Sequence, residues 1–120
     1  MKYMIMMFGD AATMREERSP AWVAEMMAFM GGFIAELEKN GELVVARGLA
    51  DPGTARTVSL VDGQVVVSDG PFAEAKESLA GFWVVEVENE ARAIELASQV
   101  VVWADRVEVR ETPDGPPDEQ

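Results

Sequence analysis

The chain of 120 residues contains no cysteine and no histidine. Without cysteine there is no disulfide, no thiolate nucleophile and no cysteine-ligated zinc. Without histidine the protein lacks the commonest general base, the Ser–His and Cys–His nucleophile systems, and the commonest transition-metal ligand. Any catalysis must therefore use Asp, Glu, Lys, Tyr, Arg or backbone groups, and we expect neither a metal nor a cofactor.

Basic residues are also scarce, since 10 Lys and Arg stand against 22 Asp and Glu, which gives a net charge of −12. Proteins that bind nucleic acids gain affinity from Lys and Arg side chains that neutralise phosphates. This composition argues against nucleic-acid binding. An acidic surface of this kind more often serves solubility than the binding of a particular cationic ligand.

Long apolar runs are missing, although 48% of the residues are hydrophobic. No run reaches the roughly 18 residues that a membrane span requires. The apolar start, residues 1–8, lacks the charged region, the length and the cleavage site of a secretion signal. We therefore expect a cytoplasmic protein that does not contact a membrane, with one domain over residues 1–112 and a disordered, acidic, Pro-rich tail over residues 113–120.

The order of the expected elements indicates a ferredoxin-like α+β domain. The expected order is β-α-β, then a hairpin, then β-α-β. This order corresponds to two split βαβ halves on a mainly antiparallel sheet. Residues 9–18 read as a polar connection. The expected strands are residues 1–8, 42–49, 56–61, 64–68, 81–87 and 106–111, and the expected helices are residues 20–39, one turn at 73–77, and a last helix after residue 89.

Local signals fix several of these boundaries. Ser19-Pro20 is an N-cap followed by a proline at the first helical position, and Asn40-Gly41 is a helix stop. Asp62-Gly63 is a strong short signal for a hairpin turn. Gly31-Gly32, inside the first long helix, costs about 2 kcal/mol relative to two alanines. Close approach to a sheet or a local kink would explain it. In the last helix, the expected apolar face is made by Ala93, Ile94, Ala97 and Val101.

Two of the expected strands are apolar on both faces. The first strand places Tyr3, Ile5 and Met7 on one face and Met4, Met6 and Phe8 on the other, and residues 82–85 are likewise apolar throughout. An antiparallel sheet that is covered on one face and solvated on the other should instead alternate apolar and polar residues. Two helices can cover only one face, so we expect a second copy of the chain to cover the other in a face-to-face homodimer.

The segment 69–77 is the leading candidate site. Asp69-Gly70-Pro71 is a stiff turn between two strands, and such loops often carry sites. In the functional interpretation Asp69 is the catalytic acid or base, or a polar anchor. The other candidate ligand-binding residues of this segment are Pro71, Phe72, Glu74, Lys76 and Glu77, with Phe72 as a wall. The alternative is a plain charged turn, because Asp114-Gly115-Pro116 repeats the tripeptide in the tail.

Arg47, in an otherwise apolar strand, is the remaining candidate ligand-binding residue. If it points inward, it needs a carboxylate such as Asp69 or an anionic ligand, and if it points outward it is merely exposed. Tyr3 and Trp83 are more typical of core or dimer-interface aromatics than of catalytic groups. The methionines form a deformable core or line an adaptable apolar pocket: Met4, Met6, Met7, Met26, Met27 and Met30.

Several segments together resemble the DGPF-domain branch of the YCII-related proteins. These are Met1-Lys2-Tyr3-Met4, residues 69–77 with Gly81-Phe82, residues 93–97, and Val107-Glu108-Val109-Arg110. The resemblance implies a ferredoxin-like fold in a dimeric α/β barrel. It also implies a His–Asp catalytic pair with the aspartate at Asp69, and for this branch an association with extracytoplasmic-function sigma factors.

The chain departs from that family pattern in two ways. It has no histidine, so a His–Asp pair cannot operate, and it reads Val100-Val101-Val102-Trp103 where the family usually has a proline. Two hypotheses follow. The first is a small-molecule site beside the Asp69-Gly70-Pro71-Phe72 loop, which leaves enzymatic activity open. The second is a non-catalytic regulatory or interaction module, with a sigma factor as a possible partner.

Overall fold

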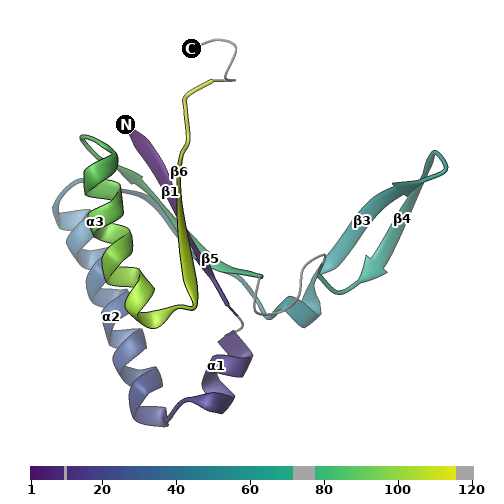
Figure 1. Cartoon of the computed structure of the whole chain (residues 1–120), viewed down its shortest axis with the longest axis horizontal. Helices are drawn as coiled ribbons and strands as arrows, with labels where there is room; N and C mark the ends of the chain where they lie inside the picture. Colours follow the sequence, from purple (N-terminus) through teal and green to yellow (C-terminus); the bar gives the residue numbers. More distant parts are fainter. Residues whose placement is uncertain (10, 72–77, 116–120) are drawn as a thin grey trace.

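Four strands form an antiparallel sheet in the order β2-β5-β1-β6 in the computed structural model of the chain (Figure 1). The structure describes residues 1–9, 11–71 and 78–115, with the backbone alone for 11–13. The strands are β1 (Lys2–Phe8), β2 (Leu43–Gly48), β3 (Arg56–Val61), β4 (Gln64–Asp69), β5 (Leu79–Glu86) and β6 (Arg106–Glu111). The helices are α1 (Ala11–Glu17), α2 (Pro20–Lys39) and α3 (Glu90–Val100), with short 3-10 turns η1 (Pro52–Thr54) and η3 (Val101–Trp103).

The central strand is β1, which pairs with β5 on one side and β6 on the other. Ile5 lies opposite Trp83 in β5 and opposite Val109 in β6. β5 in turn pairs with β2, where Ala46 lies opposite Trp83. The strand order β2-β5-β1-β6, with α2 between β1 and β2 and α3 between β5 and β6, is the ferredoxin-like arrangement. The α+β prediction is therefore confirmed.

The helices α2 and α3 cover one face of the sheet (Figure 1). The buried core lies between them and the sheet, and includes Ile5, Leu37, Val85 and Val100, which are almost inaccessible to solvent. Tyr3 and Trp83 are buried in the same cluster, which agrees with their assignment as core aromatics. Burial raises the pKa of the Tyr3 hydroxyl, with smaller contributions from Glu111 and Glu90. Within the described residues no helix is both long and apolar enough to cross a membrane.

The helix ends follow the predicted signals. The Ser19 side chain accepts a hydrogen bond of 3.1 Å from the Trp22 amide at the start of α2. At its end Asn40 is the C-cap, and Gly41 adopts a φ of +69° that glycine tolerates without strain. Asn89 caps α3 by accepting from the Arg92 amide at 3.0 Å.

Three expectations need correction. The connection over residues 9–18 contains the helix α1, because Ala, Met, Arg and Glu are strong helix formers and outweigh the polar composition. In α3 the buried stripe is Ala93, Leu96, Ala97 and Val100, whereas Ile94 and Val101 are exposed. A Cβ added at Gly31 or Gly32 would meet no atom within 4 Å, so close approach to the sheet does not explain this pair.

The strands β3 and β4 form a separate two-stranded sheet. Asp62 and Gly63 both have positive φ, +50° and +80°, as a type I′ hairpin turn requires. The hairpin projects from the body on the side of the sheet that α2 and α3 do not cover (Figure 1). The predicted hairpin is therefore confirmed, and it stands apart from the main sheet.

One ion pair joins the start of α3 to the connection between α2 and β2. Arg92 donates from Nε and Nη2 to the two carboxylate oxygens of Glu42, at 2.9 and 2.8 Å. Glu42 is only 14% exposed, and its backbone also accepts from the Glu86 amide. The hydrogen bonds from Arg92 hold the pKa of Glu42 below its usual range, against the opposing effect of burial.

We predict that Arg92→Leu lowers the free energy of unfolding by about 2 kcal/mol at pH 7, because it leaves the Glu42 carboxylate without its charged partner. Since the pKa of Glu42 is lowered in the folded state, this stabilisation is complete above about pH 4.5 and disappears as the pH falls through the lowered value. Urea unfolding at pH 7 and near pH 3 measures both values.

The matched control is Glu95→Gln, which removes only the more exposed partner of Arg92 and should cost less than about 0.5 kcal/mol. An Arg92→Leu effect of equal size at both pH values would mean that Arg92 stabilises by packing rather than by its charge.

Candidate ligand-binding cavity

An apolar cavity of about 420 Å³ lies between α2 and the end of the sheet formed by β2 and β5. Cavities of roughly 300–1,000 Å³ are typical of small-molecule sites. The lining comes from every element around this end of the sheet: Met7, Met14, Arg15, Trp22, Val23, Met26, Met27, Met30, Ile34, Ala46, Arg47, Gly48, Leu49, Ala80, Gly81 and Trp83.

One wall of the cavity is the inner stripe of α2. Trp22 and Met26, then Met30 and Ile34, recur at four-residue intervals and therefore lie on one face of the helix. The aromatic neighbours of this wall hold it in place: Trp22 packs against Trp103 with ring centroids 5.5 Å apart. The wall is thus a methionine-rich surface backed by packed aromatic rings.

The floor is formed by small residues in β2 and β5. Ala46, Gly48, Ala80 and Gly81 leave space where larger side chains would fill the gap beneath α2. At Gly81 glycine is required, because a Cβ would lie 2.9 Å from the backbone oxygen of Arg47. At Gly48, by contrast, a Cβ would meet no atom within 4 Å, so that position opens onto free space.

Two arginines are the charged residues in the described lining of the cavity. Arg15, in α1, lies at its edge with a side chain that is 59% exposed, and its Nη2 atom lies 3.5 Å from Asp51 Oδ1. Arg47 also borders the cavity. The sheet register pairs it with Phe82, the residue before the buried Trp83, so its side chain lies on the opposite face of the sheet from Trp83. Among the described residues that line the cavity, none is an acid.

The structure places the predicted catalytic residue, Asp69, outside this lining. Asp69 is the last residue of β4, its side chain is 88% exposed, and its Oδ1 atom lies 3.3 Å from Arg56 Nε in β3. Arg47 takes the exposed alternative, and its Nη1 atom donates to the backbone oxygen of Ala46 at 3.0 Å. Asp69 and Arg47 are therefore not paired with each other.

Pro71 is exposed, and the other predicted ligand-binding residues, Phe72, Glu74, Lys76 and Glu77, lie outside the described residues. The segment nevertheless leads directly into the cavity floor. Ser78 is buried, its backbone oxygen accepts from the Gly9 amide at 3.0 Å, and the chain then enters β5 with Ala80 and Gly81. The predicted loop and the cavity are thus neighbours along the chain.

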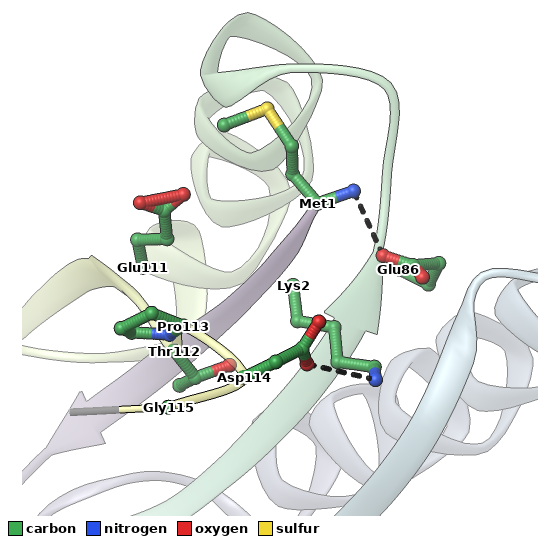
Figure 2. A pocket seen from close by; sticks show the side chains of 8 residues that line it. All are labelled: Met1, Lys2, Glu86, Glu111, Thr112, Pro113, Asp114 and Gly115. Carbon is green, nitrogen blue, oxygen red and sulfur yellow. Dashed lines mark hydrogen bonds and ion pairs between the residues drawn. The ribbon is translucent and has the colours of Figure 1, made fainter. Parts of the chain in front are cut away.

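A second hollow, of about 410 Å³, lies between the N-terminus and residues 111–115 (Figure 2). Its charged groups are already paired: the Met1 amino group lies 2.9 Å from Glu86, and Lys2 Nζ lies 3.5 Å from Asp114 (Figure 2). Its walls are polar and apolar in equal measure, whereas the walls of the cavity beneath α2 are mostly apolar, as in most ligand pockets. The cavity beneath α2 is therefore the stronger candidate site.

Residues over the described ranges form no group of three or more acids that could hold a metal ion. The sequence pattern predicts a deformable core or an adaptable pocket lined by methionines, and Met7, Met26, Met27 and Met30 do line the cavity. It does not reveal Met14 and Arg15, because it predicts a polar connection where α1 lies. It does not reveal Gly48 either, whose only signal is a glycine at the end of a strand.

Comparison with known proteins identifies the family of this chain. The model of the YCII-related domain matches residues 1–113. An uncharacterized protein of Rhizobium meliloti (strain 1021) is 28% identical over 101 residues, which cover 81% of this chain and 77% of that protein. Since the family model covers nearly the whole chain, the protein belongs to the YCII-related domain family.

Proposed function

We propose that the protein binds a small, largely apolar molecule in the cavity beneath α2. The observation that carries this proposal is the combination of about 420 Å³ of space, methionine walls and a floor of small residues. Methionine side chains are flexible and polarisable, so they adapt to ligands of different shape. The proposed site differs from the predicted one, since it lies next to the Asp69-Gly70-Pro71-Phe72 loop along the chain and does not include Asp69.

The ligand class that fits is an amphiphilic anion, such as a medium-chain or aromatic carboxylate. The apolar body would lie against α2, and the anionic group would compete with Asp51 for Arg15 at the edge. The described lining residues include no acid that could act as a general base. Binding without turnover is therefore the simplest activity for this cavity.

Within the family we propose that the chain belongs to the DGPF-domain branch, on the sequence of residues 69–77.

We also propose that the chain forms a face-to-face homodimer. The support for the dimer is the uncovered face of the sheet, where Met4, Met6, Phe82 and Val84 are half-buried and no described helix lies over them (Figure 1). A monomeric protein rarely leaves a contiguous apolar face of this kind open to water.

We predict that Gly48→Leu weakens binding of sodium decanoate, because the new side chain occupies cavity space where a Cβ meets nothing within 4 Å. Isothermal titration calorimetry should show an affinity at least about 10-fold weaker, or 1.4 kcal/mol. Gly53→Leu is the matched control, since it adds the same side chain in η1, also into open space, outside the cavity lining.

Equal loss of binding in both leucine variants would contradict the cavity assignment. If the wild-type protein is dimeric but binds neither decanoate nor an aromatic carboxylate such as naphthoate, the alternative gains support. That alternative is a non-catalytic regulatory module associated with an extracytoplasmic-function sigma factor.

We predict that Arg15→Gln weakens decanoate binding by about 5-fold, the effect of losing one partly exposed charge pair. Binding of decanol, which has no charge, should stay unchanged, and the same titration measures both ligands. Equal weakening for decanol and decanoate would mean that Arg15 shapes the cavity rather than pairing with an anion.

We predict that the wild-type protein sediments as a dimer at micromolar concentration and that Met6→Lys shifts it to a monomer. The variant places a charge in the middle of the uncovered sheet face, which would have to be desolvated on association. Lys2→Met, at the end of the same face, should leave the dimer intact. A monomeric wild-type protein would refute the dimer.

A further inference from the structure

The β3–β4 hairpin has one apolar face and one mostly polar face. The register pairs Val58 with Val67 and Leu60 with Val65, and these four residues form what we call the apolar ladder. Because side chains alternate along a strand, the opposite face carries the intervening pairs. These are Thr57 with Ser68, Ser59 with Val66, and Val61 with Gln64.

The apolar ladder is open to solvent in the single chain. Val58 is 65% exposed, Leu60 71%, Val65 70% and Val67 61%. An isolated two-stranded hairpin is marginally stable in water, and exposed apolar strands promote association with other chains. Four large apolar side chains on one face of such a hairpin therefore indicate a surface that another molecule covers.

The base of the hairpin is held by specific contacts. The Gly70 amide donates to the Ala55 backbone oxygen at 2.8 Å, and the Thr57 hydroxyl donates to the Gly70 backbone oxygen at 2.8 Å. The Arg56–Asp69 ion pair continues the apolar ladder at this end. Asp69, the candidate catalytic residue, thus has a structural partner that fixes where the hairpin begins.

The hairpin lies on the same side of the molecule as the uncovered face of the sheet. Figure 1 shows α2 and α3 on one side of the sheet and the hairpin extending away on the other. A body that packs on the uncovered face therefore lies beside the hairpin. We propose that the hairpin is an arm whose apolar ladder packs against a second copy of this chain, an inference that rests on the proposed homodimer.

The charges favour a second copy over other occupants. A protein with a net charge of −12 is repelled by nucleic acids and by anionic membranes. A second copy carries the same net charge, but the ladder face itself has none, because Arg56 and Asp69 cancel, so contact through this face meets less repulsion than contact through an acidic face. In a two-fold dimer each copy presents the same surfaces, so one association covers both sheet faces and both arms.

The test compares two double variants of the full chain by sedimentation equilibrium over a series of concentrations. Leu60→Thr/Val65→Thr changes the apolar ladder, and Val61→Thr/Val66→Thr changes the same number of exposed apolar residues on the opposite face. Threonine retains high β-propensity, and circular dichroism checks that both variants fold. The ladder variant should raise the dimer dissociation constant at least about 10-fold, and the control should change it less than about 3-fold.

Each other outcome overturns the arm in a distinct way. If the ladder variant dimerises like the wild type while Met6→Lys does not dimerise, the dimer stands and the arm is wrong. If both double variants weaken the dimer equally, the ladder is not the contact. If the wild type is monomeric, both the dimer and the arm are wrong. If it pellets with phosphatidylcholine vesicles and the ladder variant does not, the occupant is a membrane.

Discussion

The central strand β1 carries apolar side chains on both of its faces, and most of the molecule follows from that constraint. Its buried residues, Tyr3, Ile5 and Met7, pack beneath α2 and α3, whereas Met4 and Met6 lie on the uncovered side. The two helices cover one face of the sheet (Figure 1). In the proposed dimer, the uncovered face and the projecting hairpin are the parts of the chain that a second copy would cover.

The cavity results from a local mismatch between helix and sheet. Large side chains from α2 meet small residues at the ends of β2 and β5, so the two layers do not fill the space between them. Gly81 must be glycine because the backbone of β2 approaches it closely. At Gly48 no atom would meet a Cβ, so the glycine there leaves open space. Close backbone packing in one strand and open space in its neighbour together shape the floor.

Much of this fold could be predicted from local patterns, because capping residues, strand alternation and the Asp62-Gly63 turn act over short distances. The ion pair between Arg92 and Glu42 could not, since 50 residues separate its members and no pattern links them. The candidate site was predicted only in part. The methionine stripe is a helical pattern, but the cavity also needs small residues from two strands that meet only in the folded chain. The motif around Asp69 predicts a site, but it does not predict the partner Arg56, which the hairpin register places opposite Asp69.

The way the hairpin is inserted makes it separable from the rest of the domain. Gly48 pairs with Gly81, and the Leu49 amide donates to the Ala80 backbone oxygen at 2.8 Å. The strands β2 and β5 are therefore joined at the two points where the segment that contains the hairpin leaves and re-enters the main sheet. Because the entropy of closing a loop grows only slowly with its length, residues between these points can be lengthened or shortened at small cost to the sheet. The segment between these points is therefore a region in which relatives of this chain can differ in length and sequence while keeping the same core.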